Sequence, residues 1–237
     1  YVTLRQRLAH GLSYAVNYTR STLRDDASSV FDASILTGPV ANFPVADSYN
    51  RRLERDYSTG DIPHPFTASA VWDVPFGDGR ARGPGGVVGA VVNDWTLSGV
   101  VTLQSGVPLA IAQTTNNNAF AGFGSQRPNL VGDPELPADE RTTSRWFNTS
   151  AFSAAPPFTL GSSTRNPVRG PAYRNLDLAI VRRVPLPGRA AIELRGEVFN
   201  ATNTPALGAP NTTVGAAAFG SITSAGDPRV VQLAVKL

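Results

Sequence analysis

The segment Ile192-Glu193-Leu194-Arg195-Gly196-Glu197-Val198 alternates apolar or small residues with charged ones along its whole length. Successive side chains of a β-strand point to opposite faces, so an extended segment of this kind has one apolar and one charged face. A soluble sheet buries such an apolar face, whereas the wall of a transmembrane β-barrel turns it toward lipid and turns the charges toward a watery lumen. The segment therefore predicts a strand of one or the other kind.

Six further segments have the same period of two. Their expected apolar faces carry Val2, Leu4 and Leu8; Leu12, Tyr14, Val16 and Tyr18; Phe66, Ala68, Ala70, Trp72, Val74 and Phe76; Trp95, Leu97, Gly99, Val101 and Leu103; Leu176, Leu178 and Ile180; and Val231, Leu233, Val235 and Leu237. The opposite faces carry mostly polar residues. We predict antiparallel strands, each paired with its sequence neighbour, near residues 1–9, 12–24, 62–76, 95–107, 173–184, 190–200 and 229–237.

The connections between these segments alternate between short and long. The long connections, near residues 24–62, 107–173 and 203–229, lack periodicity. Such loops are uncommon in compact soluble domains, whereas membrane barrels carry them on their outer side. We therefore predict an all-β fold, an antiparallel meander of about seven strands that forms part of a transmembrane outer-membrane β-barrel. Within the connection from 76 to 95, the stretch 87–92 predicts either a short helix or an extension of the next strand.

The composition restricts the class of protein further. The chain has no cysteine, which excludes disulfides and thiolate metal sites, and only 16% of its residues are charged, below the roughly 25% of typical soluble domains. No apolar run approaches the roughly 18 residues of a membrane helix, so contact with a bilayer would be made by strands. Arginines are scattered along the chain and Lys236 is the single lysine, a pattern that does not indicate nucleic-acid binding.

A series of short motifs follows in a recognisable order. These motifs are Trp95–Val100, Gln104–Leu109, Arg127–Leu130, Trp146–Phe152, Arg169–Pro171, Asn175–Leu178, Arg195–Asn203, Phe219–Ile222 and Pro228–Leu233. From about Trp72 to the end of the chain, the series resembles the carboxy-terminal barrel region of TonB-dependent outer-membrane receptors of the Oar-like type.

The resemblance implies a location in the cell outer membrane and the binding or uptake of an unidentified substrate. Barrels of this class have about 22 strands and a plugged lumen, so residues 1–237 are expected to be a carboxy-terminal fragment that lacks the plug and the amino-terminal regulatory-like domain. The implied partners are outer-membrane lipid, the remaining barrel strands and plug of the parent receptor, TonB through that plug, and the substrate. No nucleic acid is among them.

The sequence gives little support for an enzyme. Its two histidines, His10 and His64, lie in different expected hairpins, and Ser105 lacks the Gly-x-Ser-x-Gly context of a hydrolase nucleophile. Glu193 and Glu197 would lie about 13 Å apart on a strand that rises about 3.3 Å per residue, farther than the carboxylates of a glycosidase. We predict no enzymatic activity and no cofactor.

The charged face of the opening segment is a candidate ligand-binding site. Glu193, Arg195 and Glu197 share that face, and Asp177 lies on the expected neighbouring strand. One interpretation is a ladder in which these charges neutralise one another in the lumen, and the other is direct contact with a ligand. Trp146 and Phe147, with Phe152, lie in the central long connection, where they are expected either to hold that connection against itself or to stack on a ligand.

Four carboxylates in the same connection are candidates for calcium binding, because calcium prefers oxygen ligands. They are Asp133, Glu135, Asp139 and Glu140. Their spacing does not match an EF-hand, and the alternative is a solvated loop without metal.

A rival interpretation of the whole chain is a secreted β-sandwich that serves as an adhesion or carbohydrate-binding module. A sandwich needs two sheets that face each other over a shared core, whereas part of a barrel leaves one continuous apolar face on a single sheet. The arrangement of the sheets therefore distinguishes the two.

Overall fold

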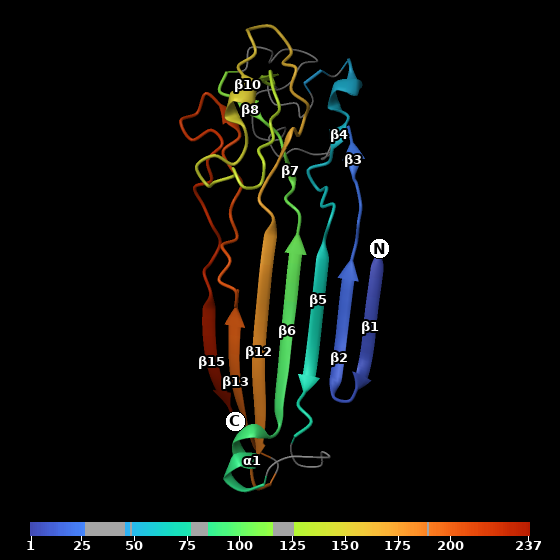
Figure 1. Ribbon diagram of the computed structural model, residues 1–237, viewed down its shortest axis with the longest axis vertical. Coiled ribbons are helices and arrows are strands. Elements are labelled where there is room, and N and C mark those ends of the chain that lie inside the picture. Colours follow the sequence, from blue (N-terminus) through green and yellow to red (C-terminus); the bar gives the residue numbers. More distant parts are fainter. Residues whose placement is uncertain (27–45, 48, 77–84, 116–125, 189) are drawn as a thin grey trace.

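The computed structural model describes residues 1–26, 46–47, 49–76, 85–115, 126–188 and 190–237. One antiparallel sheet of seven strands dominates it, in the order β1-β2-β5-β6-β12-β13-β15 (Figure 1). Its strands are β1 (Val2–Ala9), β2 (Leu12–Tyr18), β5 (Phe66–Asp73), β6 (Trp95–Gln104), β12 (Tyr173–Pro185), β13 (Ala191–Phe199) and β15 (Val230–Lys236). Each expected strand is present and pairs with its sequence neighbour, which confirms the predicted meander.

Three strands, β2, β5 and β6, fall at least three residues short of the prediction on the side of the long connections. The predicted segments 12–24 and 62–76 extend beyond β2 and β5 as observed. Thr19 and Ser21 still donate backbone hydrogen bonds of 3.1 Å to the carbonyls of Pro65 and Pro63. Proline has no N–H to return, so the regular ladder stops at Phe66.

The register confirms the predicted faces of the sheet. Along one row, Val16 lies opposite Ala68, Ala68 opposite Val101, and Val101 opposite Leu176. The adjacent row on the other face pairs Asn17 with Thr67, Thr67 with Thr102, and Thr102 with Asn175. The apolar residues of neighbouring strands therefore share one face, which we call the apolar face, and the polar residues share the polar face.

The pattern of the apolar face is interrupted at three places. A register shift lies between Gln6 and Ala9, so the predicted alternation of β1 fails around Leu8. Arg174 and Arg182 of β12 lie in rows of the apolar face, opposite Leu103 and Trp95. Both arginines are near the ends of the sheet, where a long side chain can carry its charge to water.

The first hairpin turns in two residues. His10 and Gly11 have φ angles of 54° and 79°, as a type I′ turn requires at both central positions. A Cβ on Gly11 would lie 2.5 Å from the carbonyl oxygen of Asp73, so only glycine allows β2 to approach the end of β5.

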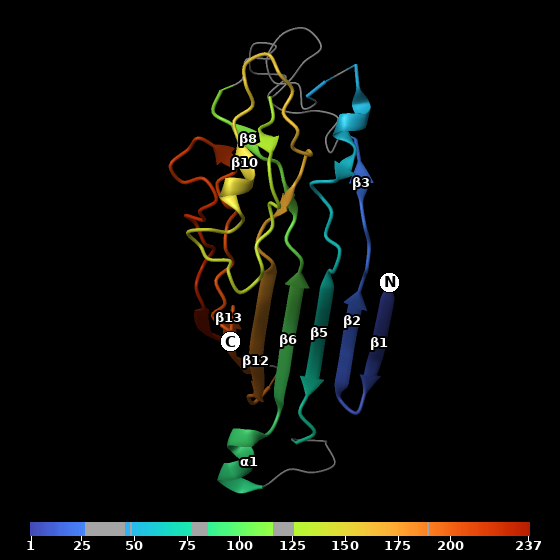
Figure 2. The same cartoon turned by 45° about the horizontal axis from the view of Figure 1, so that its top comes forward.

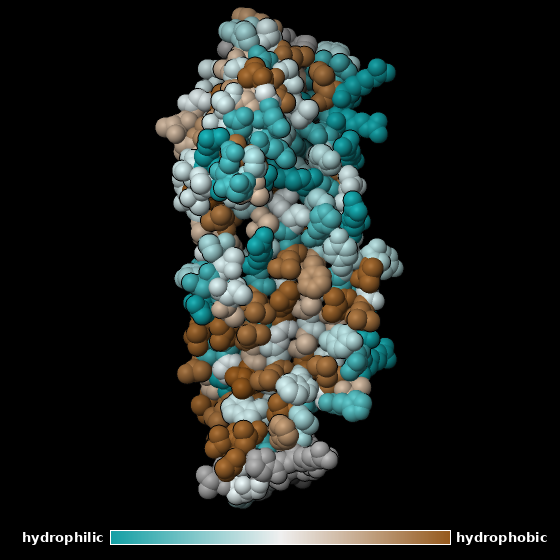
Figure 3. Space-filling view, viewed as in Figure 1, coloured by the Kyte–Doolittle hydropathy of each residue, from teal (hydrophilic) through white to brown (hydrophobic). Residues whose placement is uncertain are grey.

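The apolar face has no second large sheet packed on it in the described part of the chain. Leu233 and Val235 are 82% and 74% exposed, and Figure 3 shows hydrophobic side chains gathered over the strands in the lower half of the molecule. All other described sheets are two-stranded. The β-sandwich interpretation is therefore wrong, because no shared core lies between facing sheets among the described residues.

The remaining elements are short and lie mostly in the long connections, which gather beyond one end of the sheet (Figure 2). They are β3 (Arg24–Asp25), η2 (Arg51–Glu54), β4 (Asp56–Tyr57), β7 (Pro108–Leu109), β8 (Ala112–Gln113), β9 (Asn129–Leu130), η3 (Thr149–Ala151), β10 (Phe152–Ser153), β11 (Val168–Arg169) and β14 (Thr213–Val214). At the opposite end, the connection from β5 to β6 contains α1 (Gly86–Val92), so the helical alternative for this stretch is correct. None of the described helices has the length and apolar character needed to cross a membrane.

We expect residues 1–237, expressed alone, to aggregate in detergent-free buffer. In the described part of the chain β1 and β15 each pair on one side only, and open strand edges next to an exposed apolar face favour association. Size-exclusion chromatography with and without detergent checks this. A sharp monomeric peak without detergent, with cooperative unfolding, would contradict it.

Two matched substitutions test the faces of the sheet. Leu178 on the apolar face and Val100 on the polar face are each 45% exposed. In the complete gene product we expect Leu178→Arg to reduce assembly into the membrane, because arginine on the lipid face costs about 2–4 kcal/mol at the bilayer midplane. Val100→Arg should assemble normally. Heat-modifiable migration of the membrane fraction on gels measures assembly, and equal behaviour of both variants would overturn the assignment of the faces.

Candidate functional site

The described parts of the three long connections pack together beyond the sheet, and we call this unit the outer assembly. Its core consists of Ile111, Phe147, Ala151, Phe152 and Val168, against which Leu109, Leu130, Trp146, Val214 and Phe219 pack. Phe147, Phe152 and Phe219 meet edge to face, with ring centroids 5.2–6.0 Å apart. Since Phe219 comes from the third connection and the other two from the second, this aromatic cluster joins the two connections.

The structure assigns a packing role to the predicted aromatic residues. Phe147 is 2% exposed and Phe152 7%, so they hold the connection against itself as one interpretation predicted. The indole N–H of Trp146 donates a 2.9 Å hydrogen bond to the carbonyl of Arg169. Trp146 is only partly buried, and ligand contact through its ring stays a prediction.

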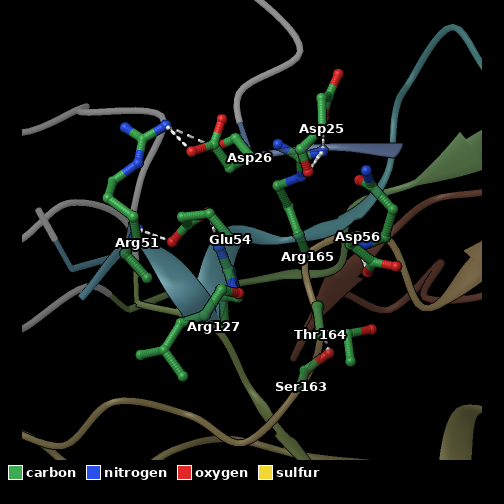
Figure 4. A network of polar contacts seen from close by, with 12 residues as sticks. Asp25, Asp26, Arg51, Glu54, Asp56, Arg127, Ser163, Thr164 and Arg165 are labelled. Atoms are coloured by element: carbon green, nitrogen blue, oxygen red, sulfur yellow. Dashed lines mark hydrogen bonds and ion pairs between the residues drawn. The ribbon is translucent and has the colours of Figure 1, made fainter. Parts of the chain in front are cut away.

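Charged pairs that the sequence did not predict join the first connection to the second (Figure 4). Glu54, which is fully buried, pairs with Arg127, and Asp25 pairs with Arg165. The pairs are separated by 73 and 140 residues in sequence, so no local pattern indicates them. The one available signal was that Arg127 opens one of the motifs quoted for the family resemblance.

A third pair, between Asp61 and Arg169, lies in the same interface. Asp61 is 1% exposed, and its carboxylate accepts hydrogen bonds of 2.5 Å from Arg169 Nη2 and 2.6 Å from the Leu23 N–H. The guanidinium groups of Arg24 and Arg169 lie 4.5 and 4.8 Å from the centre of the Tyr57 ring. The ring therefore contacts two cations, which the electron-rich face of an aromatic ring attracts.

These contacts change the pKa of Asp61. Burial raises it, but the hydrogen bonds from Arg169 and from Leu23, with the charges of Arg169 and Arg24, lower it more, so the pKa lies below its ordinary value. A lowered carboxyl pKa stabilises the folded state above the ordinary pKa of about 3.9, and this stabilisation is lost as the pH falls through the lowered pKa.

A close backbone crossing fixes the base of the outer assembly on the sheet. β7 pairs antiparallel with β11, and the Gly170 N–H donates 2.9 Å to the carbonyl of Val107. A Cβ on Gly106 would lie 1.8 Å from the Gly170 carbonyl oxygen, so no other residue allows the two strands to approach so closely. The glycine in the motif Gln104–Leu109 has this structural role.

The predicted charge ladder is present on the polar face. Arg195 contacts Glu193 at 3.0 Å and Glu197 at 3.4 Å, and Lys236 lies opposite Glu193 on β15. These residues border a hollow of about 300 Å³ with Gln232 and Ala234. The ion pairs of the expected ladder are present, and contact of this ladder with a ligand stays a prediction.

Asp177 does not join the ladder as expected. Its carboxylate accepts 2.9 Å hydrogen bonds from the Asn175 side chain and from the backbone N–H of Asn200, which has a φ of 50°. Asp177 therefore fixes the turn after β13. It also borders a hollow of about 480 Å³ at the outer end of the polar face, which Tyr173, Phe199 and Asp227 help to line.

The four candidate calcium ligands do not converge. Asp133 accepts a 3.0 Å hydrogen bond from the Glu135 N–H, while Glu135 and Glu140 face Arg141 and Arg145 at 4.0 and 3.9 Å. Among the described residues, no group of three or more histidine, aspartate or glutamate side chains is placed to hold a metal ion. Asp139, in the same loop, is likewise not part of such a group.

A single sheet with one exposed apolar face, long connections gathered at one end and a charged opposite face is the wall of a membrane β-barrel. The family model described as "Outer membrane beta barrel domain" matches residues 1–232, and the chain belongs to this family. Its location is the outer membrane, where the apolar face meets lipid. No curated protein and no solved structure matches the chain.

We expect Asp61→Asn to loosen the first connection from the outer assembly at neutral pH. Loss of a hydrogen bond to a charged group costs about 1.5–3 kcal/mol, so the amide of Leu23 should exchange hydrogen faster. Exchange measured by mass spectrometry on the detergent-solubilised protein checks this. Wild type should lose this protection below about pH 4, after correction for intrinsic rates, and the variant should lack that step.

Glu135→Gln is the control for this experiment. The Glu135 side chain is 60% exposed and lies 4.0 Å from Arg141, so its loss should leave exchange at Leu23 unchanged. Equal exchange in wild type and Asp61→Asn would mean that the buried pair does not hold the connection.

Proposed function

We propose that the chain is the carboxy-terminal part of the barrel of a TonB-dependent receptor of the Oar-like type, which binds or imports an unidentified substrate. The observation that carries this proposal is where the motifs of the resemblance fall. Arg127, Phe147, Arg169 and Phe219 belong to four of those motifs, and all four residues hold the outer assembly together. The motifs thus supply an ordered structure above the membrane in addition to lipid-facing strands.

The substrate is proposed to pass beneath this assembly along the polar face. The hollow near Tyr173 and Phe199 offers two exposed aromatic rings, 39% and 43% exposed, together with the carboxylates of Asp177 and Asp227. Aromatic surface with a few polar groups is typical of sites that hold small molecules. The role proposed for these residues is binding, without catalysis and without a cofactor.

The proposed partners follow from the receptor class. Outer-membrane lipid covers the apolar face, further barrel strands pair with the free edges of β1 and β15, and a plug fills the lumen. TonB would act through that plug. Nucleic acid is not among the proposed partners.

The test compares three strains of the source organism: wild type, a deletion of the complete gene, and a deletion of TonB. Each is grown on the same complex medium, and the compounds that remain in it are measured by untargeted mass spectrometry. We expect at least one compound to persist with both deletions and to disappear with wild type. If the TonB-deleted strain consumed every compound that persists with the gene deletion, the proposal would be overturned and the assignment to an outer-membrane barrel would be unaffected.

A further inference from the structure

The connection from β5 to β6 carries an apolar helix at the inner end of the barrel wall. Every residue of α1 (Gly86–Val92) is glycine, alanine or valine. Val88, Val91 and Val92 are 62%, 61% and 44% exposed. Their spacing of three and four residues places them on one side of the helix. Exposed apolar side chains so close together indicate a surface that contacts a membrane or another protein in place of water.

Two side chains from the apolar face hold the end of α1. The Trp95 indole N–H donates a 2.8 Å hydrogen bond to the carbonyl of Val91, and Arg182 Nη1 lies 3.5 Å from the same oxygen. The Arg182 guanidinium lies 5.7 Å from the centre of the Trp95 ring. Trp95 and Arg182 are opposite each other in a row of the apolar face, so α1 is attached on the side that meets lipid.

The position of α1 along the strands points to the edge of the membrane. Barrels of this kind have their long connections outside and their short ones in the periplasm, which places α1 at the periplasmic boundary. Tryptophan is enriched at this boundary, and arginine can extend its charge from there to lipid headgroups.

We propose that α1 lies in the periplasmic leaflet of the outer membrane, with Val88 and Val91 toward the acyl chains and Arg182 toward phospholipid phosphates. The occupant of this surface is lipid because α1 continues a face that already meets lipid. Figure 3 shows hydrophobic surface reaching the lower end of the molecule, where Figure 1 places α1. Seven residues span about 10 Å of helix, enough to lie in the leaflet and too few to cross it.

The sequence permits a direct test, because the 237 residues contain no cysteine. Val91→Cys is introduced into the complete gene product, any cysteine elsewhere is replaced by serine, and a nitroxide label is attached. The protein is reconstituted into vesicles of phosphatidylethanolamine and phosphatidylglycerol. Electron paramagnetic resonance then measures the access of oxygen, which concentrates in lipid, and of a polar nickel chelate, which stays in water.

Two further sites calibrate the measurement. Leu178→Cys reports the apolar face, and Val131→Cys reports an exposed valine of the outer assembly, 65% exposed beside 61% for Val91. We expect the ratio of oxygen to nickel access at Val91 to be several-fold higher than at Val131 and nearer to that at Leu178. A ratio equal to that at Val131 would overturn the proposal, and so would exclusion of both reagents, which would indicate a protein partner.

A second pair of variants tests the attachment. Arg182→Ala should lower the ratio at Val91 and increase the mobility of its label, because it removes a contact to α1. Arg174→Ala removes the other arginine on the apolar face of β12 and should leave both values unchanged. Equal effects of the two variants would contradict the role of Arg182.

Discussion

The backbone hydrogen-bond ladder of the sheet is the constraint on which the rest of the structure depends. In hydrocarbon an unpaired N–H or C=O costs several kcal/mol, so a strand that crosses a membrane must pair with its neighbours throughout. Pairing fixes the register, and a shift by one residue would move Thr67, Thr102 and Asn175 from the polar face to the lipid. The ladder ends at Pro63 and Pro65, where the chain leaves the sheet for the outer assembly.

A different kind of interaction holds the outer assembly, where water is available and the ladder ends. Its aromatic core joins the second and third connections, while buried charged pairs join the first to the second. Buried ion pairs add little net stability, because desolvation offsets most of the attraction, but breaking one leaves an uncompensated charge. The ion pairs of Glu54 and Asp61 therefore favour one arrangement of the first connection over others, and they add little to the free energy of unfolding.

Periodicity predicted the seven strands, their neighbours and their faces. The alternation of apolar and polar side chains is a local property of the sequence, and each strand keeps it when it pairs in the sheet. On that basis Asp177 was predicted to join the ladder of Arg195. Its carboxylate instead accepts a hydrogen bond from the backbone N–H of Asn200 in the turn after β13. The ion pairs of the outer assembly could not be predicted, since partners such as Asp25 and Arg165 are 140 residues apart and lie in irregular loops. Long-range contacts between loops leave no periodic signal in one sequence.

Two arginines support the membrane placement independently of periodicity. Arg174 and Arg182 interrupt the apolar face of β12 and are eight residues apart, which is about 26 Å of strand. A tilt of about 40° reduces this to a height of roughly 20 Å, and side chains that extend outward at both ends bring the charges to the edges of an apolar band about 25 Å tall. Between the two arginines, the same face carries Leu176, Leu178 and Ile180, which are all apolar. The spacing of the two charges thus matches the thickness of the hydrocarbon that the strand must cross.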